Sequence, residues 1–373
     1  MRTVDAAGLE IGDGHPPRIM GVLNLSPESP YDPSVFDDPD EAAAYVDAEL
    51  IGEGADIVDV GLESANKRFE VRDAEWELDR LDLAIETIEA VDSDAAFSIE
   101  TRYHEVAAEA LDRGFDMVND ICGFADPEMP RVCRERDAAV SKMASPPDLE
   151  RPGAIEDVDD IYAALQREGL TEKTLVDPAF GGWSEDKTTD DDRETFRRLR
   201  EFRGLGQPIL VSINRKNFVR ELAGRSTEEA LPVSLAATAM AVERGAHVVR
   251  THDVAETRDA ALVGQAFARE RVRTEGVEEL DVTTAREADR HLERLGLAGE
   301  AAGGSVARAF ALSGLDPGGR DRLIAAAEGT GATAVADGER GFLAGTAASL
   351  DRLGGELDGL ERLRDALHGA LDR

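Results

Sequence analysis

The sequence contains little cysteine, little lysine, few aromatic residues and no long apolar run. Two cysteines, Cys122 and Cys133, are present among 373 residues, and their separation fits neither a CxxC pair nor a metal-binding pattern. We therefore expect reduced cysteines that pack in the interior. No run approaches the roughly 20 apolar residues of a membrane helix, and the start of the chain does not resemble a signal peptide. We expect a cytoplasmic protein that does not bind a membrane.

Positive charge is also scarce. Asp and Glu number 78 against 42 for Lys and Arg, which gives a formal net charge of -36. This excess argues against nucleic acid as a partner, because binding it depends on basic patches that offset phosphate charge. The acidic residues are spread along the whole chain, which favours a halophilic surface adapted to high salt. An acidic partner-binding protein is the alternative.

Eight short apolar runs alternate with longer amphipathic runs over the first part of the chain. Runs that are apolar throughout indicate strands buried on both faces, and hence a parallel sheet. Eight βα units in about 250 residues predict a (β/α)8 TIM barrel. A doubly wound open sheet fits less well because no early glycine fingerprint is present. The expected strands are Arg18–Leu25, Asp56–Gly61, Ala96–Thr101, Met117–Ile121, Ala138–Met143, Thr174–Ala179, Pro208–Ile213 and Val248–Asp253.

The amphipathic runs predict one helix after each strand. Beyond them the composition changes, so we expect a barrel domain over 1–271 and a small α/β or helical domain over 272–373. The second domain has strand candidates at Ala307–Leu312, Ala332–Ala336 and Gly341–Gly345, and oligomerisation or packing is its expected role. The expected barrel helices are Pro39–Glu53, Asp73–Ala90, Tyr103–Arg113, Pro127–Arg136, Val158–Glu168, Asp190–Arg203, Thr227–Arg244 and Ala255–Arg269.

Polar side chains end nearly every expected strand, which is where active residues of a barrel lie. Burying Glu100, Asn119 and Asp177 is costly unless each has a partner, so they indicate a polar ligand that donates hydrogen bonds. The chain has only five lysines, and four of them follow these strands. We expect a site for a hydrogen-bonding heterocycle beside a phosphate or pyrophosphate. The cations expected at this site are Lys67, Lys142, Lys187, Lys216, Arg250 and His252.

Seven motifs, spread over about residues 17–270, resemble in sequence and order the signatures of dihydropteroate synthases. These enzymes join a pterin to an aminobenzoate in folate-type coenzyme synthesis. The motifs are Ile19–Ser29, Gly54–Ser64, Ile99–Arg102, Val118–Ile121, Val176–Pro178, Asn214–Phe218 and Arg250–Asp253.

The resemblance implies a role for each matching residue. The pterin would be bound by Glu100, Asn119, Asp177, Lys216 and Arg250, with the guanidinium of Arg250 on the ring face. The pyrophosphate would be bound by Asn24, Lys67, Arg250 and His252, and Mg²⁺ by Asn24. The residues implied in catalysis are Lys216, Asp32, Arg250 and His252. Loss of pyrophosphate would leave a cation-like carbon that an arylamine attacks, and we expect a homodimer.

The departures from the family pattern lie on the acceptor side of the expected site. Ser64-Ala65-Asn66 stands for Ser-Thr-Arg, Asn217 for Ser, Lys142 for His, and Glu28-Ser29-Pro30 for Asp-Ser-Phe. Three hypotheses stay open. The chain is a dihydropteroate synthase, or a transferase for another arylamine, such as one with a ribosyl phosphate held by Lys67, Lys142 and Lys187. The third is a pterin-binding or methyltransferase-like relative without synthase activity.

Overall fold

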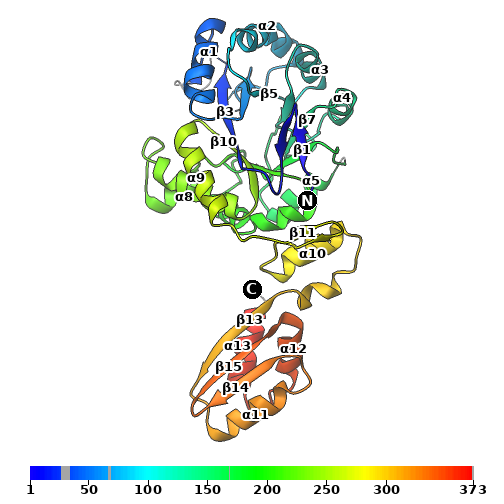
Figure 1. Cartoon of the computed structure of the whole chain (residues 1–373), viewed down its shortest axis with the longest axis vertical. Helices are drawn as coiled ribbons and strands as arrows, with labels where there is room; N and C mark the ends of the chain where they lie inside the picture. The colour runs from blue at the N-terminus through cyan, green and yellow to red at the C-terminus, as the bar shows by residue number, and fades with distance from the viewer. Residues whose placement is uncertain (27–33, 66–68, 168, 372–373) are drawn as a thin grey trace. The chain divides into compact units, whose positions relative to one another are not determined.

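The computed structural model describes residues 1–26, 34–65, 69–167 and 169–371. The chain divides into two compact units, Met1–Glu270 and Arg271–Arg373, which are described separately (Figure 1).

The first unit is a closed barrel of eight parallel strands in the order β10-β3-β4-β5-β6-β7-β8-β9. This confirms the predicted TIM barrel. Each strand lies within two residues of its expected bounds at its N-terminal end. The strands are β3 (Arg18–Asn24), β4 (Ile57–Gly61), β5 (Ala96–Thr101), β6 (Met117–Asp120), β7 (Ala139–Met143), β8 (Thr174–Asp177), β9 (Ile209–Val211) and β10 (Ala246–Thr251).

Helices follow the strands, as the amphipathic runs predict. Two expected helices are interrupted: the first continues as a π-helical turn, η2 (Val46–Ile51), and the sixth as a 3-10 turn, η3 (Leu199–Leu205). The short α7 (Asn217–Arg220) and η4 (Glu221–Ala223) were not predicted. The main helices are α1 (Pro39–Tyr45), α2 (Ala74–Ala90), α3 (His104–Asp112), α4 (Met129–Glu135), α5 (Val158–Gln166), α6 (Thr189–Arg197), α8 (Leu231–Glu243) and α9 (Val254–Ala266).

An N-terminal hairpin, β1 (Val4–Ala6) and β2 (Leu9–Ile11), closes the barrel at the N-terminal ends of the strands. Its buried side chains pack on one apolar residue from each barrel strand. Sequence reasoning missed this hairpin because strands of three residues carry little periodic signal. The apolar floor of the barrel consists of Met20, Ile57, Ala96, Met117, Ala139, Leu175, Leu210 and Val248.

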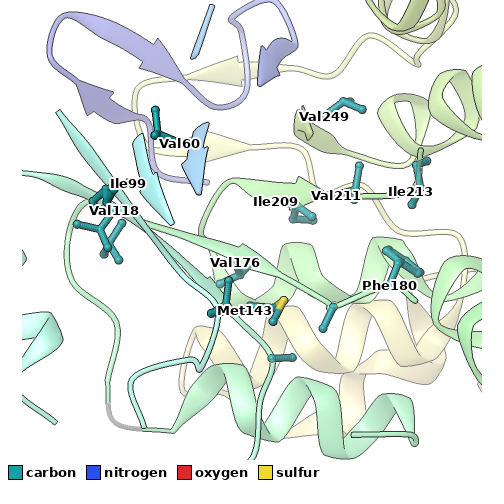
Figure 2. Packing of buried hydrophobic residues seen from close by; sticks show 14 of the residues in the cluster. Val60, Ile99, Val118, Met143, Val176, Phe180, Ile209, Val211, Ile213 and Val249 are labelled. Atoms are coloured by element: carbon teal, nitrogen blue, oxygen red, sulfur yellow. The ribbon is translucent and has the colours of Figure 1, made fainter. Parts of the chain in front are cut away.

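The opposite face of each strand packs against the helices. Alternation along a strand sends successive side chains to opposite faces. The outward side chains join the helices in one large core, in which Val60, Val118, Val176 and Val249 come from four different strands (Figure 2). Because side chains alternate, the residue two positions after each floor residue also points into the barrel.

The second unit holds a three-stranded antiparallel sheet in the order β13-β15-β14. Leucines from its helices and from β15 form a separate core. The three predicted strands are present as β13 (Ala307–Ser313), β14 (Thr333–Asp337) and β15 (Arg340–Thr346). The other elements are β11 (Arg273–Thr274), β12 (Val277–Glu278), α10 (Ala285–Arg294), η5 (Gly299–Gly304), α11 (Pro317–Ala327), α12 (Ala347–Gly355) and α13 (Glu361–Leu371).

Candidate active site

The layer above the apolar floor is polar, because alternation places the next inward residue of most strands there. Asp59 lies two residues beyond Ile57, and Arg250 two beyond Val248. Parallel pairing brings Asn24, Gly61, Glu100 and Asn119 side by side at one level of the mouth. This polar layer consists of Asp59, Ser98, Asn119, Ser141, Asp177 and Arg250.

Arg250 is the centre of this layer. Its Nε donates to Asp59 Oδ2 at 2.7 Å, and one terminal nitrogen donates to Glu100 Oε2 at 2.6 Å. Asn119 Nδ2 also donates to Asp59 Oδ2, at 2.9 Å. Burial raises the pKa of Glu100, although the charge of Arg250 acts in the opposite direction. Four predicted or neighbouring site groups are thus joined in one hydrogen-bonded network.

Asp177 and Lys216 form the second part of the site. Asp177 is buried, and burial raises its pKa to about 6, against the Ala179 N–H bond and the charges of Lys216 and Arg250. Burial and the charge of Arg250 lower the pKa of Lys216. Its ammonium lies 5.2 Å from the ring centre of Trp183.

The side chain of Lys216 packs against the backbone of Gly181, where a larger residue would not fit. A Cβ at Gly181 would lie 3.0 Å from Lys216 Nζ, and the φ of Gly181 is +121°, which L side chains rarely adopt. Sequence reasoning did not single out this glycine.

The third part of the site links Asn24 to His252. Asn24 Nδ2 donates to Ser34 Oγ at 2.8 Å, and that hydroxyl lies 3.4 Å from His252 Nδ1. Burial, with the nearby charge of Arg250, lowers the pKa of His252 to about 3. The imidazole is therefore neutral near pH 7, so its interaction with an anion begins as a hydrogen bond and not as an ion pair.

Two lysines predicted at the anion site lie elsewhere, and this part of the prediction is wrong. Lys142 is fully buried on the helix side of β7, where its Nζ donates to the carbonyls of Leu165 and Arg167 at the end of α5. A cation there is stabilised by the C-terminal end of the helix dipole. Lys187 Nζ donates to Ala179 O at 2.7 Å and lies 3.2 Å from Asp192 Oδ1.

The Lys187–Asp192 pair supports the loop that carries Gly181. Asp192 Oδ2 accepts a hydrogen bond from Gly181 N at 3.0 Å. A buried ion pair with further hydrogen bonds fixes a backbone in place. Lys187 thus acts on Lys216 through the loop after β8, and does not face an anion. Of the other predicted residues, Asp32 and Lys67 lie outside the described residues.

A cavity of about 830 Å³ opens at the barrel mouth beside Trp183. Its walls come from the loops after β4, β7 and β8, with Arg102 from the end of β5. Since Trp183 lines this cavity and its ring lies 5.2 Å from the ammonium of Lys216, the cavity adjoins the candidate site. Neither the cavity nor the place of Trp183 could be predicted from strand ends alone.

Glu77 on α2 predicts a pH dependence of stability. It is buried, Thr101 Oγ1 donates to it at 2.6 Å, and burial raises its pKa from 4.5 to about 8. Between these values the folded protein holds a proton that the unfolded chain has lost, so stability falls as pH rises through this window. Glu77→Gln should remove this contribution, which amounts to about 1.4 kcal/mol per pH unit. Urea unfolding from pH 5 to 8 tests this, and a pH-independent difference between variant and parent would contradict it.

The comparisons with known proteins match the barrel unit of the chain. Residues 20–252 match the pterin binding enzyme family. The chain belongs to this family. Thirty-two per cent identity over 267 residues relates it to a dihydropteroate synthase of Clostridium beijerinckii, covering 70% of this chain and 97% of that protein. The predicted resemblance to the dihydropteroate synthase family is confirmed.

The pterin binding enzyme region also matches longer proteins and solved structures. A probable bifunctional folylpolyglutamate synthase/dihydropteroate synthase of Haloferax volcanii is 37% identical over 67% of this chain. The match spans 30% of that protein, about a third of its length. The dihydropteroate synthase of Thermus thermophilus in complex with 4-aminobenzoate is 31% identical, with a TM-score of 0.58, over 71% of this chain and all of that one. Among the described residues, no helix has the length and apolar character needed to cross a membrane.

Proposed function

We propose that the chain is a dihydropteroate synthase, which condenses 6-hydroxymethyl-7,8-dihydropterin diphosphate with p-aminobenzoate and releases pyrophosphate. The observation that carries this proposal is the convergence of Arg250, Asp59, Glu100 and Asn119 in one buried network, with Asp177 and Lys216 beside it. Carboxylates and amides suit the amino-pyrimidinone edge of a pterin, which offers several donors. The names and aminobenzoate ligands of the matched proteins support the same reaction.

The main alternative, an arylamine with a ribosyl phosphate, loses support. It depended on extra cations at the mouth, and two of them, Lys142 and Lys187, point into packed regions. A relative without synthase activity would also bind a pterin, so binding alone does not separate it from a synthase. Turnover does.

In the proposed reaction the residues of this chain bind, orient and stabilise charge. Asp177 and Asn119 would accept and donate hydrogen bonds at the ring edge, and Lys216 would donate to the ring. Asn24 and neutral His252 would hold the diphosphate by hydrogen bonds. The pKa of His252 would rise beside that anion, since an opposite charge favours the protonated imidazole.

The oxygen donors near Asn24 fit the expected Mg²⁺. Asn24 directs Nδ2 to Ser34, and its Oδ1 would lie 3.7 Å from a Cβ built on Gly61, at the mouth of the barrel. Mg²⁺ is usually held by one or two protein oxygens together with substrate phosphates and water. When bound, it would neutralise charge on the leaving pyrophosphate. Asn24 would hold it.

Pyrophosphate release tests the proposed function. The pterin diphosphate is incubated with the protein at high salt with Mg²⁺, with and without p-aminobenzoate. Release that depends on p-aminobenzoate is expected. Binding of the pterin diphosphate without release in either condition would favour a pterin-binding relative instead.

An apolar surface on α8 and α9 supports the expected homodimer. Met240 on α8 and Leu262, Val263 and Phe267 at α9 are exposed, Phe267 by 82%, and α8 carries a single acidic residue in a chain of charge -36. Two such acidic chains repel unless the surface between them lacks charge. Phe267→Asp should convert dimer to monomer in light scattering at high salt. The matched Phe342→Asp on β15 should not, and the opposite pattern would place the contact on the second unit.

A further inference from the structure

Arg102 is a buried cation that no step of the proposed reaction uses. It follows β5, is 1% exposed, and forms part of the cavity beside Trp183. Burying a guanidinium is costly unless its hydrogen bonds are made in good geometry. The hydrogen bonds that Arg102 makes therefore indicate its structural role.

Arg102 holds two loops of the barrel mouth at once. One terminal nitrogen donates to Glu63 Oε2 at 3.2 Å, in the loop after β4. The other donates to Leu149 O at 2.6 Å, in the loop after β7. Both loops form walls of the cavity, so this guanidinium sets the distance between two of its walls.

Glu63 and Arg72, on the two sides of the loop after β4, are both linked to the residues that follow β5. Glu63 stands at its start, and its other carboxylate oxygen accepts the N–H of Arg72 at 2.8 Å. The carbonyl of Arg72 in turn accepts the hydroxyl of Tyr103 at 2.5 Å. Arg102 and Tyr103 are neighbours after β5, so the end of one strand holds Glu63 and Arg72 on the two sides of the loop.

The third wall of the cavity, the loop after β8, contacts the loop after β7. Trp183 packs so closely on Gly153 that a Cβ there would lie 2.5 Å from the indole. Ser184 Oγ donates to Glu156 Oε1 at 2.7 Å, which joins the loop after β8 to the loop after β7. The cavity is thus built by contacts among its walls, and Trp183, which lines it, also lies against the ammonium of Lys216.

We propose that Arg102 is a positioning residue for the acceptor: by holding the loops after β4 and β7, it shapes the cavity in which the arylamine lies beside Trp183. This inference rests on the proposed function. Among the described residues, Arg102 hydrogen-bonds to the loops after β4 and β7 and not to Arg250 or Asp59, although its charge also acts to lower the pKa of Glu100. Loss of Arg102 should therefore affect the acceptor and leave the hydrogen bonds of the pterin network in place.

The test compares Arg102→Met with Arg136→Met, a matched change in a partly exposed arginine paired with Asp112. Calorimetry gives the Kd of p-aminobenzoate and of the pterin diphosphate, and turnover gives kcat and KM. Loss of a charge-assisted hydrogen bond predicts a rise of about tenfold in the Kd and KM of p-aminobenzoate. The Kd of the pterin diphosphate and all constants of Arg136→Met should stay near parental values. Arg102→Lys should recover part of the loss.

Tyr103→Phe covers the case in which Arg102→Met does not fold. It removes only the hydroxyl that holds Arg72 and keeps the buried ion pair, and a smaller rise in the Kd of p-aminobenzoate is expected. Unchanged acceptor constants in the folded variants would overturn the positioning role. Because Kd is measured without turnover, a parent protein that binds p-aminobenzoate but releases no pyrophosphate would refute the proposed function alone.

Discussion

Arg250→Met is expected to destabilise the barrel and to abolish pterin binding. The guanidinium lies between Asp59, which is fully buried, and Glu100, and it hydrogen-bonds to both. Removing one partner of a buried pair leaves an uncompensated charge, which costs about 3–5 kcal/mol. Urea unfolding measures this loss. It should be smaller at pH 5 than at pH 8, since a carboxylate without its cation takes up a proton more readily.

A double variant separates charge from packing. In Glu100→Gln/Arg250→Met one of the orphaned carboxylates is neutral, so part of the stability should return, as expected for residues that contact each other. Pterin binding should not return, since the cation is still missing. Additive losses in the double variant would contradict the network described for the barrel interior.

Lys216→Met is expected to lower turnover severely while the fold survives. Lys216 is half-buried, and burial together with Arg250 already opposes its charge, so the folded state should lose little when the ammonium is removed. In the proposed reaction, however, its ammonium would be the donor beside Asp177 and the cavity. Loss of one such donor typically lowers kcat by about 100- to 1000-fold. Single-turnover pyrophosphate release measures the effect.

Lys173→Met provides the matched control. This lysine lies on the surface, where it bonds to Asp137 O at 2.8 Å and to the Asp137 carboxylate. It follows α5 and precedes β8, at the end of the barrel away from the candidate site, so full activity is expected. Near-normal turnover of Lys216→Met would remove that lysine from the site.

Fold class was accessible from the sequence because burial of a parallel strand on both faces leaves a continuous apolar run. Arg18–Leu25 shows this most clearly, since Ile19–Leu23 is apolar throughout and β3 begins at the expected residue. The hairpin at Val4–Ile11 was not accessible, because its strands are too short to show a period. The break of the first helix into a π-helical turn at Val46 depends on packing that local sequence does not reveal.

Part of the predicted polar cluster is present at the barrel mouth, and the misplacement of Lys142 has a physical cause. Reading the ends of strands found Glu100, Asn119 and Asp177, but it did not ask which face each residue occupies. Lys142 is adjacent to the inward Ser141, so alternation alone would have placed it on the helix side of β7. The pairing of Arg250 with Asp59, by contrast, joins strands that are 191 residues apart, and only the closed barrel brings them together.

The most direct test of the central claim is detection of the condensed product itself. The pterin diphosphate and p-aminobenzoate are incubated with the parent protein and with Lys216→Met at high salt with Mg²⁺, and the products are resolved by mass spectrometry. The account predicts dihydropteroate and pyrophosphate in equal amounts from the parent, and neither above background from Lys216→Met. Pyrophosphate without dihydropteroate, or equal product from both proteins, would contradict it.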